Sequence, residues 1–136
     1  MACELCGTPG GILLWQDDFC RAVLLDDPHY PGFCRVILNR HLNEMTDLSE
    51  SERSRLMRAV FAVEQAVREV VQPDKINLAS LGNVTPHVHW HVVPRFADDR
   101  HFPNPIWGEA KREGVQRQFD QLKEQLAMKI ATALNP

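Results

Sequence analysis

Residues 87–94 alternate between histidine and apolar side chains, in the order His-Val-His-Trp-His-Val-Val-Pro. Side chains along a β-strand point to opposite faces in turn, so this pattern predicts a strand over 87–93 with two chemically different faces. His87, His89 and His91 would share one face, while the apolar residues between them would point into a core. Because a strand rises about 3.3 Å per residue, neighbouring imidazoles would lie about 6.6 Å apart, close enough to contact one phosphate group or one metal ion.

The length and composition of the chain limit what it can be. Its 136 residues suit a single domain over 1–136, and 44% hydrophobic with 24% charged residues is typical of a soluble globular protein. The net charge of −3 argues against broad binding to nucleic acid. No apolar run reaches the roughly 18 residues of a membrane span, and the N-terminus lacks the features of a signal peptide. We therefore expect no membrane association and a cytoplasmic location.

A long helix is predicted in the middle of the chain. Ser49 followed by Glu52 forms a capping box, which marks a helix start, and Pro73 ends the helix. After Gly114, a second amphipathic pattern predicts a C-terminal helix that packs in the molecule or at a dimer surface. The apolar positions are Leu56, Val60, Val63, Val67 and Val70 in the first helix, and Val115, Phe119, Leu122, Leu126 and Ile130 in the second.

Four further strands complete the prediction. Apolar runs bounded by Pro and Gly predict strands over 11–15, 19–25, 33–38 and 75–81, in addition to 87–93. Strands, helix, strands, helix is the order of an α+β fold with an antiparallel sheet. We expect a core over about 10–97, followed by an irregular segment and a helix over 98–136.

Nucleophilic catalysis at phosphorus is one chemistry that suits this face. His89 is flanked symmetrically and is the natural attacking group, while His87 and His91 would bind or protonate phosphate oxygens. The loop over 82–86 leads into the strand and supplies backbone N–H groups, the amide of Asn83 and the hydroxyl of Thr85.

Metal ligation is the competing chemistry. Cys3 and Cys6 form a Cys-x-x-Cys pair, which is half of many zinc sites. Together with His41 and one histidine of the strand, they would give a closed four-coordinate set of the structural type. Cys20 and Cys34 lie in apolar runs and are expected to be small buried hydrophobes, and His29 and His101 are expected to be exposed.

The chain resembles the histidine triad (HIT) family of nucleotide hydrolases and transferases. The family pattern of three histidines separated by apolar residues is met over 87–93, and Pro94 and Arg95 follow as in many members. Pro31-Gly32, the strand over 33–38, Asn39-Arg40-His41 and the helix start at 47–50 also match. The resemblance implies a HIT-like fold: a sheet of about five antiparallel strands with one long helix, paired in a homodimer.

The resemblance also implies an activity and assigns residues to it. The middle histidine, here His89, would attack the α-phosphate of a nucleotide and form a nucleotidyl-histidine intermediate. Family substrates include dinucleoside polyphosphates, nucleoside phosphoramidates and adenylylated compounds. Sugar-phosphate transferases of the family usually carry glutamine at the third triad position, so His91 favours a hydrolase. Asp26 is the expected ribose ligand, and Asn83 and Thr85 the expected phosphate-side contacts, although many members have Gly-Gln where this chain has Gly82-Asn83.

Some members of the family bind zinc through an N-terminal Cys-x-x-Cys. The corresponding ligands here would be Cys3, Cys6, His41 and His87, and no organic cofactor is expected.

Trp107 would contact a base or a partner subunit, or serve as a packing anchor. Two alternatives to a hydrolase stay open: a nucleotide- or zinc-binding module with little catalysis, and a protein that acts by association through its C-terminal helix.

Overall fold

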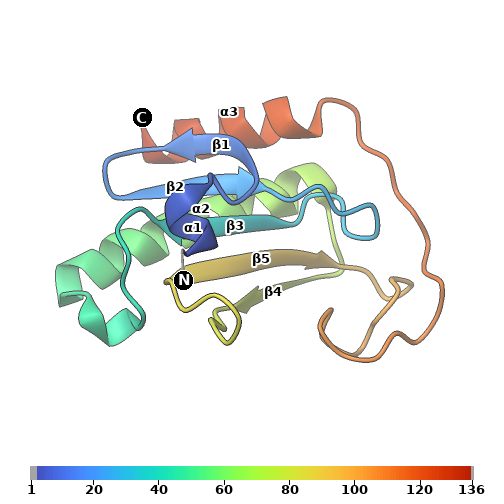
Figure 1. Ribbon diagram of the computed structural model, residues 1–136. Coiled ribbons are helices and arrows are strands. Elements are labelled where there is room, and N and C mark those ends of the chain that lie inside the picture. Colours follow the sequence, from blue (N-terminus) through green and yellow to red (C-terminus); the bar gives the residue numbers. More distant parts are fainter. Residues whose placement is uncertain (1–2, 136) are drawn as a thin grey trace.

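The computed structural model describes residues 3–135, and an antiparallel sheet of five strands forms its centre (Figure 1). Met1, Ala2 and Pro136, which the predicted domain includes, lie outside the described residues. The strands are β1 (Ile12–Gln16), β2 (Cys20–Leu24), β3 (Cys34–Leu38), β4 (Lys75–Ala79) and β5 (His89–Arg95), in the spatial order β1-β2-β3-β5-β4. The helices are α1 (Glu4–Gly7), the 3-10 turn η1 (Met45–Asp47), α2 (Glu50–Val71) and α3 (Leu122–Leu134). The predicted α+β class is confirmed.

All five predicted strands are present, but the histidine strand begins two residues later than predicted. β5 starts at His89 and not at His87. The reason lies in the hydrogen bonds of residue 88: the Val88 N–H donates to the carbonyl of Leu42, in a loop, over 2.8 Å. Val88 therefore bonds to this loop and, through its carbonyl, to the N–H of Leu38 on β3 over 3.2 Å, and it does not continue the ladder between β5 and β4.

The central helix follows its sequence signals closely. The Ser49 hydroxyl accepts the N–H of Glu52, and the Glu52 carboxylate accepts the N–H of Ser49, so the predicted capping box is confirmed. Leu56, Val60, Val63 and Val67 are buried, while Val70 is half-buried. The helix ends at Val71, and the next residue, Gln72, adopts the left-handed conformation that closes many helices.

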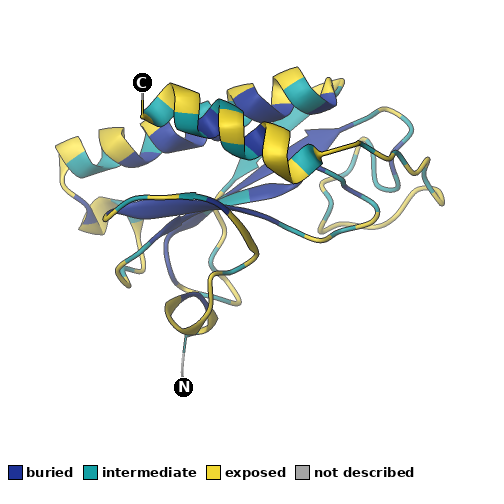
Figure 2. Ribbon diagram, turned by 90° about the horizontal axis from the view of Figure 1, so that it is seen from above, coloured by how far each residue is buried: buried dark blue, intermediate teal, exposed yellow. Residues whose placement is uncertain are grey.

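Both long helices cover one face of the sheet, as Figure 2 shows from above. α3 starts at Leu122, later than predicted, because residues 98–121 form an extended irregular segment and Val115 is tied by its N–H to the Asp98 carbonyl. Leu126 and Ile130 of α3 are fully buried in the same core as α2. The apolar stripe of α3 therefore packs within the chain. Among residues 3–135, no helix is long and apolar enough to cross a membrane.

Candidate functional site

The face of the sheet opposite the helices carries the histidines. Val88 and Val92 point into the main core, whereas His89 and His91 point away from it, as the alternation predicts. The two imidazole rings are perpendicular, with their centroids 4.9 Å apart. They lie in a cleft of about 430 Å³ whose other walls are Arg35, Trp107, Glu4 and the loop over 81–85.

A hydrogen bond to the backbone orients His89. Its Nδ1 lies 2.6 Å from the carbonyl oxygen of His87. A carbonyl oxygen only accepts hydrogen bonds, so Nδ1 carries the proton and Nε2 is left with a lone pair. Burial lowers the pKa of His89, and the charge of Arg35 lowers it further, against the opposing effect of the bond to His87. The imidazole is therefore neutral near pH 7, as a nucleophile must be.

His91 is a neutral neighbour of His89. Burial lowers its pKa to about 4, with further contributions from the charges of His89 and Arg35. Its Nδ1 is buried and has no hydrogen-bond partner among residues 3–135. The ring of Trp107 packs against it with centroids 4.8 Å apart. His91 thus keeps a polar atom free, and near pH 7 it can offer an N–H but not a full positive charge.

The structure brings the predicted phosphate-side residues to the cleft but not the predicted ribose ligand. Asn83 and Thr85 line the cleft with His89 and His91. Gly82 has a φ of +81°, a conformation that favours glycine and turns the loop toward the strand. Asp26 is exposed beyond the end of β2 and is not on the cleft wall. Its role in binding ribose remains a prediction.

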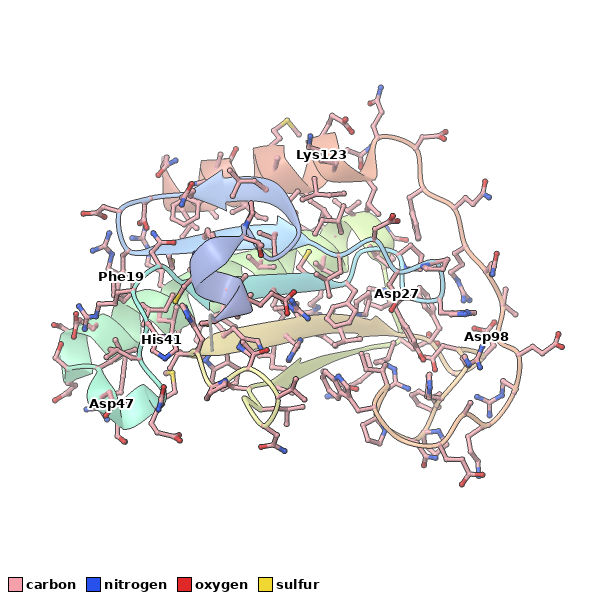
Figure 3. The ribbon with its side chains drawn as sticks, in the orientation of Figure 1. Phe19, Asp27, His41, Asp47, Asp98 and Lys123 are labelled. Atoms are coloured by element: carbon pink, nitrogen blue, oxygen red, sulfur yellow. The ribbon has the colours of Figure 1, made fainter. Side chains whose placement is uncertain are left out.

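His87 does not line this cleft and belongs to a second cluster. The ligand atoms of Cys3, Cys6, His41 and His87 all lie within 4.8 Å of one another. Both sulfur atoms lie 3.5 Å from Nδ1 of His87, and the Cys6 sulfur lies 3.4 Å from Nδ1 of His41. Figure 3 shows His41 next to α1, the short helix that carries Cys6. The four residues that the sequence proposed for a metal are therefore gathered in one place.

The geometry of this cluster fits a tetrahedral ion. Metal–sulfur and metal–nitrogen bonds of zinc, about 2.3 and 2.0 Å long, would place sulfur and nitrogen about 3.5 Å apart. Nε2 of His87 bonds to the Leu38 carbonyl oxygen over 2.6 Å, and Nε2 of His41 to the Asn43 side-chain oxygen over 3.1 Å. Each bond places the proton on Nε2 and leaves Nδ1 free to ligate, as is usual for metal-binding histidines. The cluster can hold a metal ion.

A buried arginine that the sequence analysis did not single out holds the N-terminal segment in place. Arg21 on β2 donates to the carbonyl oxygens of Leu5, Thr8 and Pro9 at 2.6, 3.3 and 2.9 Å. It also donates to the Asn39 side-chain oxygen at 3.1 Å. These bonds fix the backbone around Cys6 against the sheet. An arginine within the otherwise apolar stretch over 20–25 was the available signal.

A second buried arginine positions the segment that carries Trp107. Arg95, at the end of β5, forms an ion pair with Asp99 at 2.8 Å, and both side chains are less than 5% exposed. Asp99 also accepts the hydroxyl of Tyr30, which in turn bonds to His101 over 2.6 Å. The expectation that His101 is exposed is therefore wrong, because this network half-buries it. The same expectation is wrong for His29, which is half-buried with its Nε2 3.4 Å from Nη1 of Arg100. The network fixes residues 95–104 and so the path of the chain toward Trp107.

Comparisons with known proteins identify the family of the chain. A family model described as HIT domain matches residues 11–98. An AP-4-A phosphorylase of Mycobacterium tuberculosis is 29% identical over 104 residues, which are 72% of this chain and 53% of that protein. A bis(5'-nucleosyl)-tetraphosphatase [asymmetrical] of Schizosaccharomyces pombe is 31% identical over 93 residues, 64% of this chain and 51% of that protein. The chain spans about half the length of these curated relatives.

Solved structures give the same result for the whole fold. A histidine triad protein of Bradyrhizobium japonicum superposes with a TM-score of 0.76 at 26% identity, covering 90% of this chain and 92% of that one. A histidine triad protein of Marinobacter aquaeolei has a TM-score of 0.73 at 24% identity, with 99% and 96% covered. The family match spans the sheet, α2 and the histidine strand, and we conclude that the chain belongs to the HIT domain family.

Proposed function

We propose that this protein is a nucleotide hydrolase in which His89 attacks a nucleotide α-phosphate. The observation that carries the proposal is the 2.6 Å bond from Nδ1 of His89 to the His87 carbonyl, which leaves Nε2 as a neutral nucleophile in an open cleft. The relatives described above, an AP-4-A phosphorylase and a bis(5'-nucleosyl)-tetraphosphatase, support a phosphoanhydride substrate. Nucleoside phosphoramidates and adenylylated compounds present the same α-phosphate and belong to the same proposal.

The reaction would take two displacements at one phosphorus atom. In the first, a bond forms between Nε2 of His89 and the α-phosphorus, and the leaving group departs with the electron pair of its bond. In the second, water attacks the phosphorus, the bond to Nε2 breaks, and its electron pair returns to the imidazole while the water gives up a proton. Asn83, Thr85 and His91 face the cleft and would donate hydrogen bonds to the phosphate oxygens.

The metal cluster has a structural role in this proposal. Bound zinc would be held by all four side chains, Cys3, Cys6, His41 and His87, and would stabilise the fold of the N-terminal segment. A closed set of four protein ligands leaves no position for substrate or water. We further propose that the nucleotide substrate binds to a homodimer, as the family resemblance implies.

One observation favours a second candidate, a nucleotide-binding module with little catalysis. With its pKa lowered to about 4, His91 is neutral near pH 7, so it is not in the imidazolium form that would act as general acid toward a leaving group. A substrate phosphate beside it would raise that pKa, because an anion favours the charged imidazolium form. Turnover therefore distinguishes the two candidates.

Replacing the nucleophile tests the proposal directly. We expect His89→Ala to abolish turnover of both an adenosine phosphoramidate and a dinucleoside tetraphosphate, and mass spectrometry of rapidly quenched wild-type protein to show a nucleotidyl adduct on His89. His29→Gln, outside the cleft, is the matched control and should keep wild-type rates. Substantial turnover by His89→Ala would refute the nucleophile, and absence of turnover by the wild type on both substrates would favour the binding module.

A further inference from the structure

The cleft contains a positive charge that no described residue neutralises. Arg35 lies on β3, and its guanidinium makes one long hydrogen bond, 3.4 Å from Nη1 to the Gly10 carbonyl oxygen. Its Nε is buried and has no hydrogen-bond partner in the described part of the chain. Among residues 3–135, no carboxylate oxygen lies within the 4.0 Å of an ion pair. The Nε–Nη2 edge, which makes two-pronged bonds to carboxylates and phosphates, is therefore unpaired.

Arg21 and Arg95, which are buried in the sheet, have filled hydrogen-bond donors, so the half-buried Arg35 is an exception. Arg21 donates to four neutral oxygens, and Arg95 donates to the Asp99 carboxylate, the Asn77 side chain and the Asn104 carbonyl. Buried donors without acceptors are destabilising, and charged ones more so. Burial accordingly lowers the pKa of Arg35. An anion in the cleft would supply the hydrogen-bond acceptors and the negative charge that the guanidinium of Arg35 lacks.

The register of the sheet places Arg35 relative to the nucleophile. Arg35 pairs with His91 across the β3–β5 ladder, whereas His89 pairs with Ile37. Paired residues of neighbouring strands lie on the same face, so Arg35 stands beside His91, one step further along the cleft from His89. Asn83 and Thr85 line the cleft from the loop over 81–85, whereas Arg35 lines it from β3.

We propose that Arg35 binds a phosphate group of the substrate other than the one attacked by His89, so that the cleft selects nucleotides with two or more phosphates. The proposal rests on the function proposed above and names its substrate class. Glu4 is the one acidic side chain among the described residues that line the cleft. Its charge favours the ionised form of Arg35, but it forms no ion pair with the guanidinium and would repel an incoming phosphate.

Binding measurements test this inference independently of turnover. Isothermal titration calorimetry of the full chain would compare AMP with α,β-methylene-ADP, which carries a second phosphate and resists cleavage. We expect the wild type to bind the diphosphate about ten-fold or more tightly than AMP, the gain from one charge-assisted pair of hydrogen bonds. Arg35→Gln should remove that difference and leave the affinity for AMP within about three-fold. Arg35→Lys should keep part of it, and Glu4→Gln should increase it.

The stability of the variant separates binding from a structural role. A guanidinium with one long hydrogen bond and an unpaired buried Nε contributes little to the fold, so the Tm of Arg35→Gln should equal or exceed that of the wild type. Equal weakening of AMP and the diphosphate, no change in either, or a lower Tm would each overturn the proposal. If neither phosphoramidate nor tetraphosphate is hydrolysed, the proposed reaction fails, but the comparison of AMP with the diphosphate still decides the role of Arg35.

Discussion

Replacing Asp99 with Asn should destabilise the protein strongly, although the two side chains have the same shape. One carboxylate oxygen accepts Nε of Arg95 at 2.8 Å and the Phe96 N–H at 3.0 Å. The other accepts Nη2 of Arg95 at 3.1 Å, the Tyr30 hydroxyl, and the N–H groups of His101 and Phe102. An amide keeps one acceptor oxygen only, so its NH2 group must face at least two donors wherever it points.

The size of the effect follows from the burial of this pair. Removing one partner of a buried ion pair typically costs about 3–5 kcal/mol, because the remaining charge is left without compensation. Arg95 keeps its bonds to Asn77 and Asn104, which places the expected loss near the lower end, about 3 kcal/mol. At about 2.1 cal/mol/K of unfolding entropy per residue, a chain of 136 residues would lose about 10 °C of Tm.

The adjacent residue provides a matched control. Asp98 forms an ion pair with Arg117, but these side chains are 48% and 29% exposed, and exposed pairs contribute about 0–1 kcal/mol. Figure 3 shows Asp98 on the outer segment, at the opposite end of the molecule from His41. Urea and thermal unfolding of Asp98→Asn and Asp99→Asn should therefore differ by about 2 kcal/mol or more. Losses of equal size in the two variants would refute the reasoning.

Four further predictions concern acid, the metal cluster, the core and the cleft wall. Burial alone would raise the pKa of Asp99, but the hydrogen bonds from Arg95 and the backbone hold that pKa well below its usual range. The ionised carboxylate therefore stabilises the fold above about pH 4, and this stabilisation is lost as the pH falls further. The free energies of unfolding of the wild type and Asp99→Asn, measured in urea, should converge below about pH 4. A chelator should lower the Tm of the purified protein, and the effect should disappear in Cys6→Ser; an unchanged wild-type Tm would contradict a bound structural metal. Leu126→Ala should cost about 2–5 kcal/mol in urea unfolding because Leu126 is fully buried between α3 and the sheet, and a loss below about 1 kcal/mol would contradict that packing. Trp107→Ala should leave Tm within about 2 °C, since the side chain is 48% exposed, but should change KM for the nucleotide substrate; unchanged kinetics would remove Trp107 from the site.

Local sequence patterns predicted most of the fold because they report directly on the backbone. The capping box of Ser49 and Glu52 placed the start of α2 correctly, and the alternation around His89 placed two faces of a strand. The start of α3 was predicted too early, since Val115 continues the apolar periodicity of the helix. Its backbone bonds instead to Asp98, a tertiary contact that periodicity does not report.

The sequence likewise predicted one part of the candidate site, the metal cluster, and not another, Arg35. The cluster of Cys3, Cys6, His41 and His87 could be proposed because metal ligands belong to a few residue types at recognisable spacings. Arg35 could not, because an arginine inside a strand is ordinary until its neighbours are known. Its significance lies in the acceptors it lacks, and missing partners are a property of the packed structure alone.

Residue 87 serves the molecule through two chemically different parts. Its imidazole belongs to the cysteine cluster, whereas its backbone carbonyl orients the ring of His89. A substitution removes the first part and retains the second, since every amino acid brings the same carbonyl. A substitution at residue 87 can therefore remove the attachment of the N-terminal segment while the orientation of His89 is kept. A relative that has lost its cysteines could replace this histidine and still orient its nucleophile.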